Sequence, residues 1–265
     1  MKQSRFESEY ADSDLPTFEG APATHAAVRV SSDAEIPWTQ MSVLLGDTVL
    51  QAAKSFYLAK RSMQHFADLS EGEDPVGEAI AGINGRLMRM AVLDIAALND
   101  GGLAQNDPES SRTASLPTAH RRMKRHLTAA NAPADDLNQL QKLQADINGD
   151  NHTPLKYVRH LRNKWAGHPS LDRRFDAWAE ADKTLSIPTV EAALVRLVNN
   201  GHDTAAFVAS TPALADFRQP AATANLDGSI PMEAVLGNVI LWAGVERENA
   251  GANIGALRAR LEGQG

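Results

Sequence analysis

The chain has 265 residues, 43% of them hydrophobic, and a formal net charge of −7. This length and composition suffice for a sizeable hydrophobic core. The negative charge excludes a protein that coats nucleic acid over its whole surface, so any nucleic-acid site must be a local basic patch. The chain has no cysteine, which excludes disulfides, thiolate metal sites and a cysteine nucleophile.

The first residues, MKQSRFESEYADSDLP, lack the apolar stretch of a secretory signal. No apolar run approaches the roughly 20 residues that a membrane-spanning helix needs. We therefore expect a cytoplasmic protein with no membrane partner.

Residues 1–36 are acidic, rich in Ser, Ala and Pro, and show no hydrophobic period, which predicts a flexible tail. Pro37 is typical of the first turn of a helix. From there to about residue 69, apolar side chains recur at helical spacing, and the predicted buried face is formed by Leu45, Val49, Ala52, Ala53, Phe56 and Ala59.

A second helix is predicted over residues 76–98. Asp94 interrupts its apolar stripe, and a carboxylate in that position predicts a cationic partner, either Arg89 or Arg162. Ser115-Leu-Pro-Thr predicts the start of a third helix, and a fourth is expected over residues 134–147.

Thr153 followed by Pro154 predicts the N-cap and first position of a fifth helix, ending near Ala166. Ser186-Ile-Pro opens the next helix, which Gly201 is expected to end. Residues 203–228 are rich in loop-forming residues, and the remainder predicts one long terminal helix. Nothing in the sequence alternates as a strand does. We predict an all-α antiparallel bundle over 37–205, preceded by the tail and followed by a C-terminal extension, 206–265.

The stretch LRNKWAGHPS suggests a site at the end of the fifth helix. Gly167 favours a left-handed helix cap and Pro169 cannot continue the helix. His168 can therefore fold back toward Arg162. An imidazole that titrates near neutrality can carry a proton, and a guanidinium can hold phosphate oxygens, as metal-free RNA cleavage requires. From spacing alone, the same residues favour an ordinary basic helix end whose C-terminus is capped by His168.

Three blocks, RLMRMAVLDIAALND, SLPTAHRRM and LKYVRHLRNKWAGH, are followed by LSIPTVEAALVRL. In order and spacing they resemble the AbiU-type branch of the HEPN ribonucleases, over about residues 40–205. The HEPN signature is an arginine, a polar residue and a histidine four to six residues after the arginine; five residues separate Arg162 from His168 here.

The resemblance implies a dimeric helical bundle in which two motifs form one composite site. It implies a metal-independent endoribonuclease without a cofactor, of the kind found in toxin–antitoxin or phage-defence systems. Arg162 would bind phosphate, Asn163 would be the following polar residue, and His168 would act in acid–base catalysis. An antitoxin protein would be a second partner. Trp165 and Gly167 within the spacer, and Pro169 after it, depart from the usual pattern, and a stiff Pro169 would affect the position of His168.

Basic residues surround this motif and are candidate RNA contacts: Lys156, Arg159, Lys164, Arg173 and Arg174. The run HRRMKRH, residues 120–126, would follow an RNA backbone or form a solvated helix face. Trp165 would stack a base or pack in an interface. His152, His160 and His168 recur every eight residues, which is a poor spacing for metal ligands, so no metal is expected. A helical module that binds RNA or protein without cleaving it is the alternative function, and a purely structural bundle is a third.

Overall fold

The computed structural model describes residues 5–11, 38–70, 75–101, 114–166, 185–217 and 232–263. Within these ranges every regular element is a helix, which confirms the predicted all-α bundle. No helix in this part of the chain combines the length and apolar character that crossing a membrane requires.

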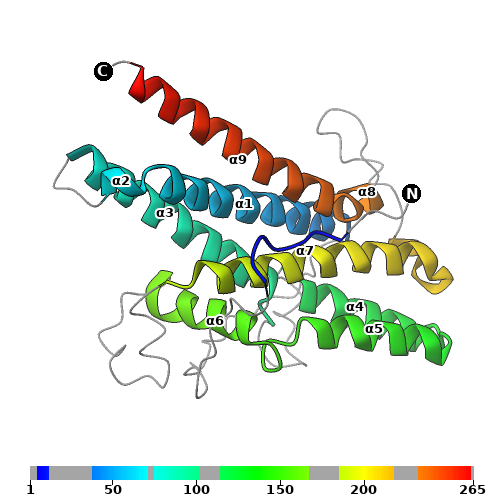
Figure 1. Cartoon of the computed structure of the whole chain (residues 1–265). Coiled ribbons are helices and arrows are strands. Elements are labelled where there is room, and N and C mark those ends of the chain that lie inside the picture. The colour runs from blue at the N-terminus through cyan, green and yellow to red at the C-terminus, as the bar shows by residue number, and fades with distance from the viewer. Residues whose placement is uncertain are drawn as a thin grey trace.

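The first long helix, α1 (Trp38–His65), lies at the centre of the bundle (Figure 1). It packs along α3 (Pro75–Leu98) and α9 (Val239–Glu262), while α7 (Ile187–Ser210) crosses nearby and α2 (Ala67–Ser70) joins α1 to α3. The face of α1 predicted from periodicity is the face that is buried. Its core side chains are Met41, Leu45, Val49, Ala52, Ala53, Phe56, Tyr57 and Ala59.

A smaller core lies at one end of the bundle. It is formed by α4 (Leu116–Ala129), α5 (Ala134–Asp146), the end of α7 and a 3-10 helix, Pro212–Phe217. The predicted start signals operate here, because the Ser115 side chain accepts a hydrogen bond from the backbone of Thr118. Ser186 caps α7 in the same way through Thr189.

The sixth helix, α6 (Thr153–Leu161), packs against α3 and α7 and continues into a π-helical turn, Arg162–Ala166. Its N-cap is His152 rather than Thr153, and no side chain caps it. Pro154 occupies the first turn as expected, so the proline was the reliable part of the signal.

The prediction that Gly201 ends a helix is wrong, because α7 continues to Ser210. Gly201 is buried, and a Cβ there would lie 3.8 Å from Val239 Cγ2 and 3.9 Å from Leu236 Cδ2. The glycine thus serves close packing rather than helix termination. The expected boundary between residues 205 and 206 consequently falls inside α7, and part of the predicted loop from residue 203 is helix.

The predicted terminal helix is divided at Asn238 into α8 (Met232–Gly237) and α9. Leu236, Val239, Ile240 and Ala243 belong to the same core as α1 and α7. The C-terminal segment is therefore part of the main bundle rather than an addition to it.

The expectation of a flexible tail is wrong for residues 5–11, which we call the strap. The strap lies along the bundle between α1 and α7 (Figure 1), and Phe6 is 4% exposed. The Phe6 ring meets the Tyr57 ring edge to face at 6.4 Å. An aromatic contact, backbone hydrogen bonds and ion pairs together hold a segment whose composition indicates disorder. Residues 12–36 of the predicted tail lie outside the described residues.

Gly46 brings α1 close to α8, and we expect Gly46→Ala to destabilise the protein. A Cβ at this position would lie 2.3 Å from Val235 Cγ1, and the stiff β-branched side chain cannot simply rotate away. The free energy of unfolding should fall by about 1–3 kcal/mol in urea denaturation. In Gly82→Ala on α3, the added Cβ meets no described atom within 4 Å, so stability should rise by up to about 1 kcal/mol. Equal changes at the two positions would contradict this account.

Candidate functional site

Arg162 lies where α6 gives way to the π-helical turn. Its backbone N–H still donates to Val158 and Arg159, and the wider turn begins at Arg162 itself. Such turns recur at functional sites because they change the direction in which successive side chains project. Arg162 and Asn163 are both partly exposed.

Among the described residues, the Arg162 guanidinium forms an ion pair from Nη1 to Asp100 Oδ2 at 3.0 Å. The two side chains are 39% and 37% exposed. Asp100 follows the end of α3, and its backbone carbonyl accepts a hydrogen bond from Ser115 Oγ at 2.6 Å. An ion pair this exposed contributes little free energy. An incoming phosphate can therefore compete with Asp100 for the guanidinium.

A second guanidinium shares the field of the same carboxylate. Arg121 of α4 donates from Nη2 to Thr118 Oγ1 at 2.9 Å. Burial and the neighbouring Arg125 lower the pKa of Arg121, and Asp100 partly offsets them. Among the described residues, Arg121, Arg125 and Arg162 thus outnumber the carboxylate of Asp100.

The basic residues of α6 extend this positive charge. Lys156, Arg159 and Arg162 are three residues apart, so they follow one side of the helix. Arg159 pairs with Asp150 at 2.9 Å. This hydrogen bond and charge, with a contribution from Lys156, hold the pKa of Asp150 below its usual value. Of the predicted RNA contacts, Lys156 and Arg159 are the two whose side chains the structure describes.

The remaining predicted site residues cannot be placed beside Arg162. His168, Arg173 and Arg174 lie outside the described residues, as do the side chains of Lys164 and Trp165. Among the histidines considered as metal ligands, His160 is buried and His152 Nε2 lies 3.2 Å from the Ala145 carbonyl oxygen. The described part of the chain contains no group of three or more His, Asp and Glu that could hold a metal ion.

Ion pairing and burial decide two further predictions, the partner of Asp94 and the role of the run at 120–126. Arg162 is not the partner of Asp94, because it pairs with Asp100 instead. Asp94 is half-buried near Asp47, and burial followed by that second carboxylate raises its pKa. The run at 120–126 is divided: Lys124 and Arg125 are exposed, whereas His120 is fully buried and bonded to Thr204. That run is therefore a helix with one solvated side.

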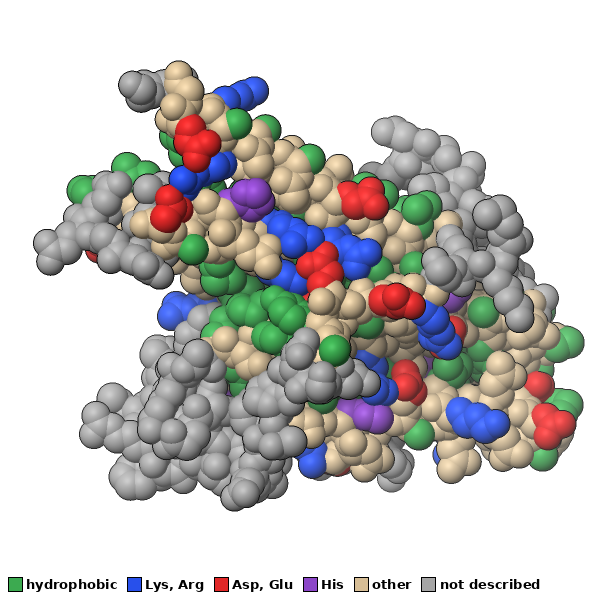
Figure 2. Space-filling model, in the orientation of Figure 1, with side chains coloured by type: hydrophobic (Ala, Val, Ile, Leu, Met, Phe, Trp, Pro, Cys, Tyr) green, Lys and Arg blue, Asp and Glu red, His purple; other side chains and the backbone are tan. Residues whose placement is uncertain are grey.

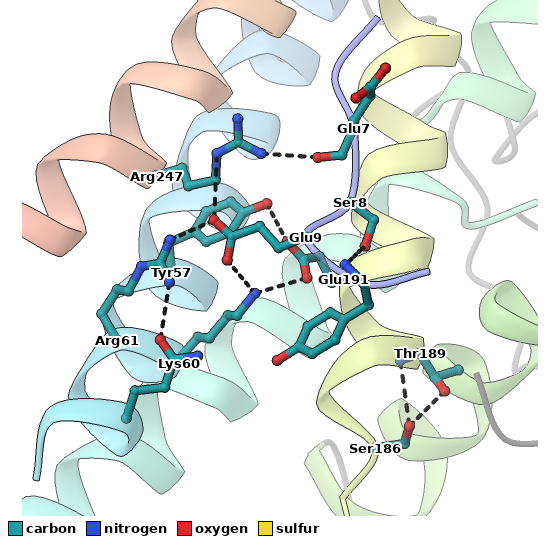
Figure 3. Close-up of polar contacts among 12 residues, drawn as sticks. Glu7, Ser8, Glu9, Tyr57, Lys60, Arg61, Ser186, Thr189, Glu191 and Arg247 are labelled. Carbon is teal, nitrogen blue, oxygen red and sulfur yellow. Dashed lines mark hydrogen bonds and ion pairs between the residues drawn. The ribbon is translucent and has the colours of Figure 1, made fainter. Parts of the chain in front are cut away.

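Sequence reasoning missed a second polar cluster, which lies under the strap (Figure 3). Glu191 of α7 is fully buried and accepts hydrogen bonds from Tyr57 Oη at 2.9 Å and Lys60 Nζ at 3.0 Å. Lys60, which is 2% exposed, also donates to Glu9 of the strap at 2.7 Å. The sequence feature that could have predicted this cluster is a charged residue beside an apolar stripe. Lys60 follows Phe56 and Ala59 on α1, and Glu191 follows Val190 on α7.

Comparison with protein-family models, with curated proteins and with solved structures yields no match. The function of the chain is therefore argued from the two sites themselves. The face shown in Figure 2 carries Lys and Arg side chains grouped around acidic ones near its centre, in the region of the strap, α1 and α9.

Proposed function

We propose that the protein is a metal-independent endoribonuclease of HEPN type, with Arg162, Asn163 and His168 as its site. The observation that carries the proposal is the position of Arg162. It ends α6 at a π-helical turn, it is 39% exposed, and it stands in line with Lys156 and Arg159. This is the arrangement that a phosphate-binding arginine needs.

The reaction that suits these residues uses the RNA's own 2′-hydroxyl. The 2′-oxygen bonds to the adjacent phosphorus while the bond from phosphorus to the 5′-oxygen breaks. The 2′-hydroxyl gives up its proton to a base, and the leaving 5′-oxygen takes one from an acid. His168 is the proton carrier in this proposal, and Arg162 stabilises the negative charge that develops on the phosphate oxygens.

Asp100 would pair with Arg162 when no RNA is bound. A phosphodiester would replace it at the guanidinium. Bidentate arginine–phosphate contacts are stronger than a single exposed contact to a carboxylate. Arg121 would then retain Asp100 as its counter-charge, so the carboxylate would not be left unpaired.

The proposal includes a second copy of the chain, whose motif would complete a composite site, and a protein antitoxin that would block it in the cytoplasm. The alternative function is a module that binds RNA or protein with a degenerate motif. The Arg162–Asp100 ion pair favours this alternative if Asp100 is not displaced.

Arg162→Ala and His168→Ala are expected to abolish RNA cleavage while leaving helical content by circular dichroism unchanged. Wild-type protein should cleave in EDTA and leave 2′,3′-cyclic phosphate ends. Arg196→Ala is the matched control, because Arg196 is also a partly exposed arginine paired with an aspartate, Asp146, at 2.7 Å. That variant should cleave as the wild type does.

Full activity of the purified His168→Ala protein would reject the assignment of His168. RNA binding by the wild type without any cleavage would favour the binding module. Failure to retain RNA even at low salt would leave a structural bundle as the remaining explanation.

A further inference from the structure

The strap places a single carboxylate among three cations. Glu9 receives Lys60 at 2.7 Å and a short hydrogen bond from Arg61, both of α1, while Arg247 Nε of α9 lies 3.9 Å away. Burial alone would raise the pKa of Glu9, but its hydrogen bonds and charge interactions with Lys60 and Arg61 outweigh burial and lower it. The Glu9 carboxylate therefore occupies a position that a free anion could also occupy.

Two of the three cations also have a partner outside the strap, because Arg61 donates to Gln64 Oε1 at 3.0 Å and Lys60 pairs with Glu191. Arg247 contacts the strap itself. Lys60 is held from the other side by the buried Glu191, which Tyr57 also binds. With Glu9 counted, Lys60, Arg61 and Arg247 still exceed the two carboxylates by one charge. A doubly charged anion would balance this cluster more closely than one carboxylate does.

An aromatic ring accompanies the carboxylate. The Phe6 ring packs edge to face on Tyr57, and the Arg247 guanidinium lies over it with Cζ 4.7 Å from the ring centroid. Arg247 thus contacts the ring and approaches the carboxylate at the same time. A tyrosine edge and a guanidinium plane also suit a nucleobase, which stacks on such groups.

The strap is attached mainly by polar contacts: besides the ion pairs of Glu9, Lys60 Nζ lies 4.2 Å from the centroid of the Tyr10 ring. Asn199 exchanges two hydrogen bonds with the Phe6 backbone, at 3.2 and 3.0 Å. Arg247 donates to the Glu7 carbonyl at 2.9 Å, and Arg5 makes an ion pair with Asp203. Phe6 is its only buried hydrophobic side chain. A segment with so little buried surface can leave without unfolding the bundle.

We propose that the cluster of Lys60, Arg61 and Arg247 under the strap is a binding site for a nucleoside monophosphate, which the strap covers. Glu9 occupies the place of the phosphate and Phe6 the place of the base, so the ligand and the strap exclude each other. This site is separate from the proposed RNA-cleaving residues, and neither proposal depends on the other.

Glu9→Gln is the decisive variant, with adenosine monophosphate as the probe and calorimetry at constant ionic strength as the measurement. Removing the internal competitor should tighten binding about tenfold over the wild type, the value of one charge-assisted hydrogen bond. Glu7→Gln is the matched control, because it removes an exposed carboxylate of the same strap, and it should leave the affinity unchanged. Phe6→Ala should tighten binding as Glu9→Gln does, since it also releases the strap.

Three further measurements complete the test. Arg61→Ala should weaken binding of the monophosphate, and adenosine without phosphate should bind at least about tenfold more weakly to Glu9→Gln. Adding the monophosphate to wild-type protein should speed hydrogen exchange at the Phe6 amide, which Asn199 now holds. Melting curves of each variant establish that it is folded. Absence of binding to folded Glu9→Gln, or equal affinity in Glu9→Gln and wild type, would overturn the proposal.

Discussion

Glu191→Met is expected to lower the free energy of unfolding by about 3–5 kcal/mol, the usual cost of removing one member of a buried ion pair. Glu191 is fully buried and Lys60 is 2% exposed. Without Glu191, the ammonium keeps only Glu9, whose side chain is 29% exposed, and the Tyr57 hydroxyl loses its acceptor. Retention of Glu9 places the expected loss toward the lower end of the range.

The double variant Lys60→Met/Glu191→Met separates the charge effect from lost packing. Apolar side chains of similar volume often replace a buried pair at little cost. We therefore expect the double variant to be more stable than Glu191→Met alone, as measured by urea denaturation of both. Glu248→Met on the exposed side of α9 is the control and should change stability by no more than about 0.5 kcal/mol. A double variant less stable than the single one would contradict this account, because it would show that Lys60 still stabilises the fold through Glu9 when Glu191 is absent.

His120 is expected to make the protein lose stability in mild acid. The ring is fully buried, and its Nε2 lies 2.8 Å from Thr204 Oγ1. Its Nδ1 has no hydrogen-bond partner among the described residues. Protonation would place a charge and an unpaired N–H in the core, so burial lowers the pKa of His120 from 6.5 to about 3.

The unfolded chain binds this proton near pH 6.5 and the folded chain does not. The stabilisation is therefore complete above pH 6.5 and is lost as the pH falls toward 3. The loss reaches about 2 kcal/mol at pH 5 and about 5 kcal/mol over the whole interval.

His120→Gln keeps a polar group near Thr204 but cannot titrate. The stability difference between wild type and this variant should shift against the wild type by about 1.4 kcal/mol for each pH unit below 6.5. Denaturation at pH 7, 6 and 5 measures it. Parallel stability curves for the two proteins would mean that His120 does not remain neutral in the fold.

Local signals predicted the helices well because their causes are local. Ser115 and Ser186 cap their helices with their own side chains, and both are followed by a proline that fits the first turn. Gly201 misled the prediction because a glycine can end a helix or admit a neighbouring one. Only the approach of Val239 and Leu236, far along the chain, decides between these roles.

The candidate sites were less predictable from the sequence, because they depend on contacts between residues far apart in the chain. The spacing of Lys156, Arg159 and Arg162 along one helix was readable, but the pairing of Arg162 with Asp100 joins residues 62 positions apart. Glu9 and Glu191 look like ordinary acidic residues in sequence. Their importance arises from Lys60 of α1, which is buried and contacts both α7 and the strap.

Some partners of the strap lie early in the chain, on α1, and others come late. Phe6 bonds to a residue 193 positions further on, and the Glu7 carbonyl to one 240 positions further on. During synthesis the contacts with Asn199 and Arg247 can form only after most of the polypeptide has left the ribosome, whereas those with α1 need only the first helix. Complete docking is therefore a late step, and a chain interrupted before α9 would lack the Arg247 contact.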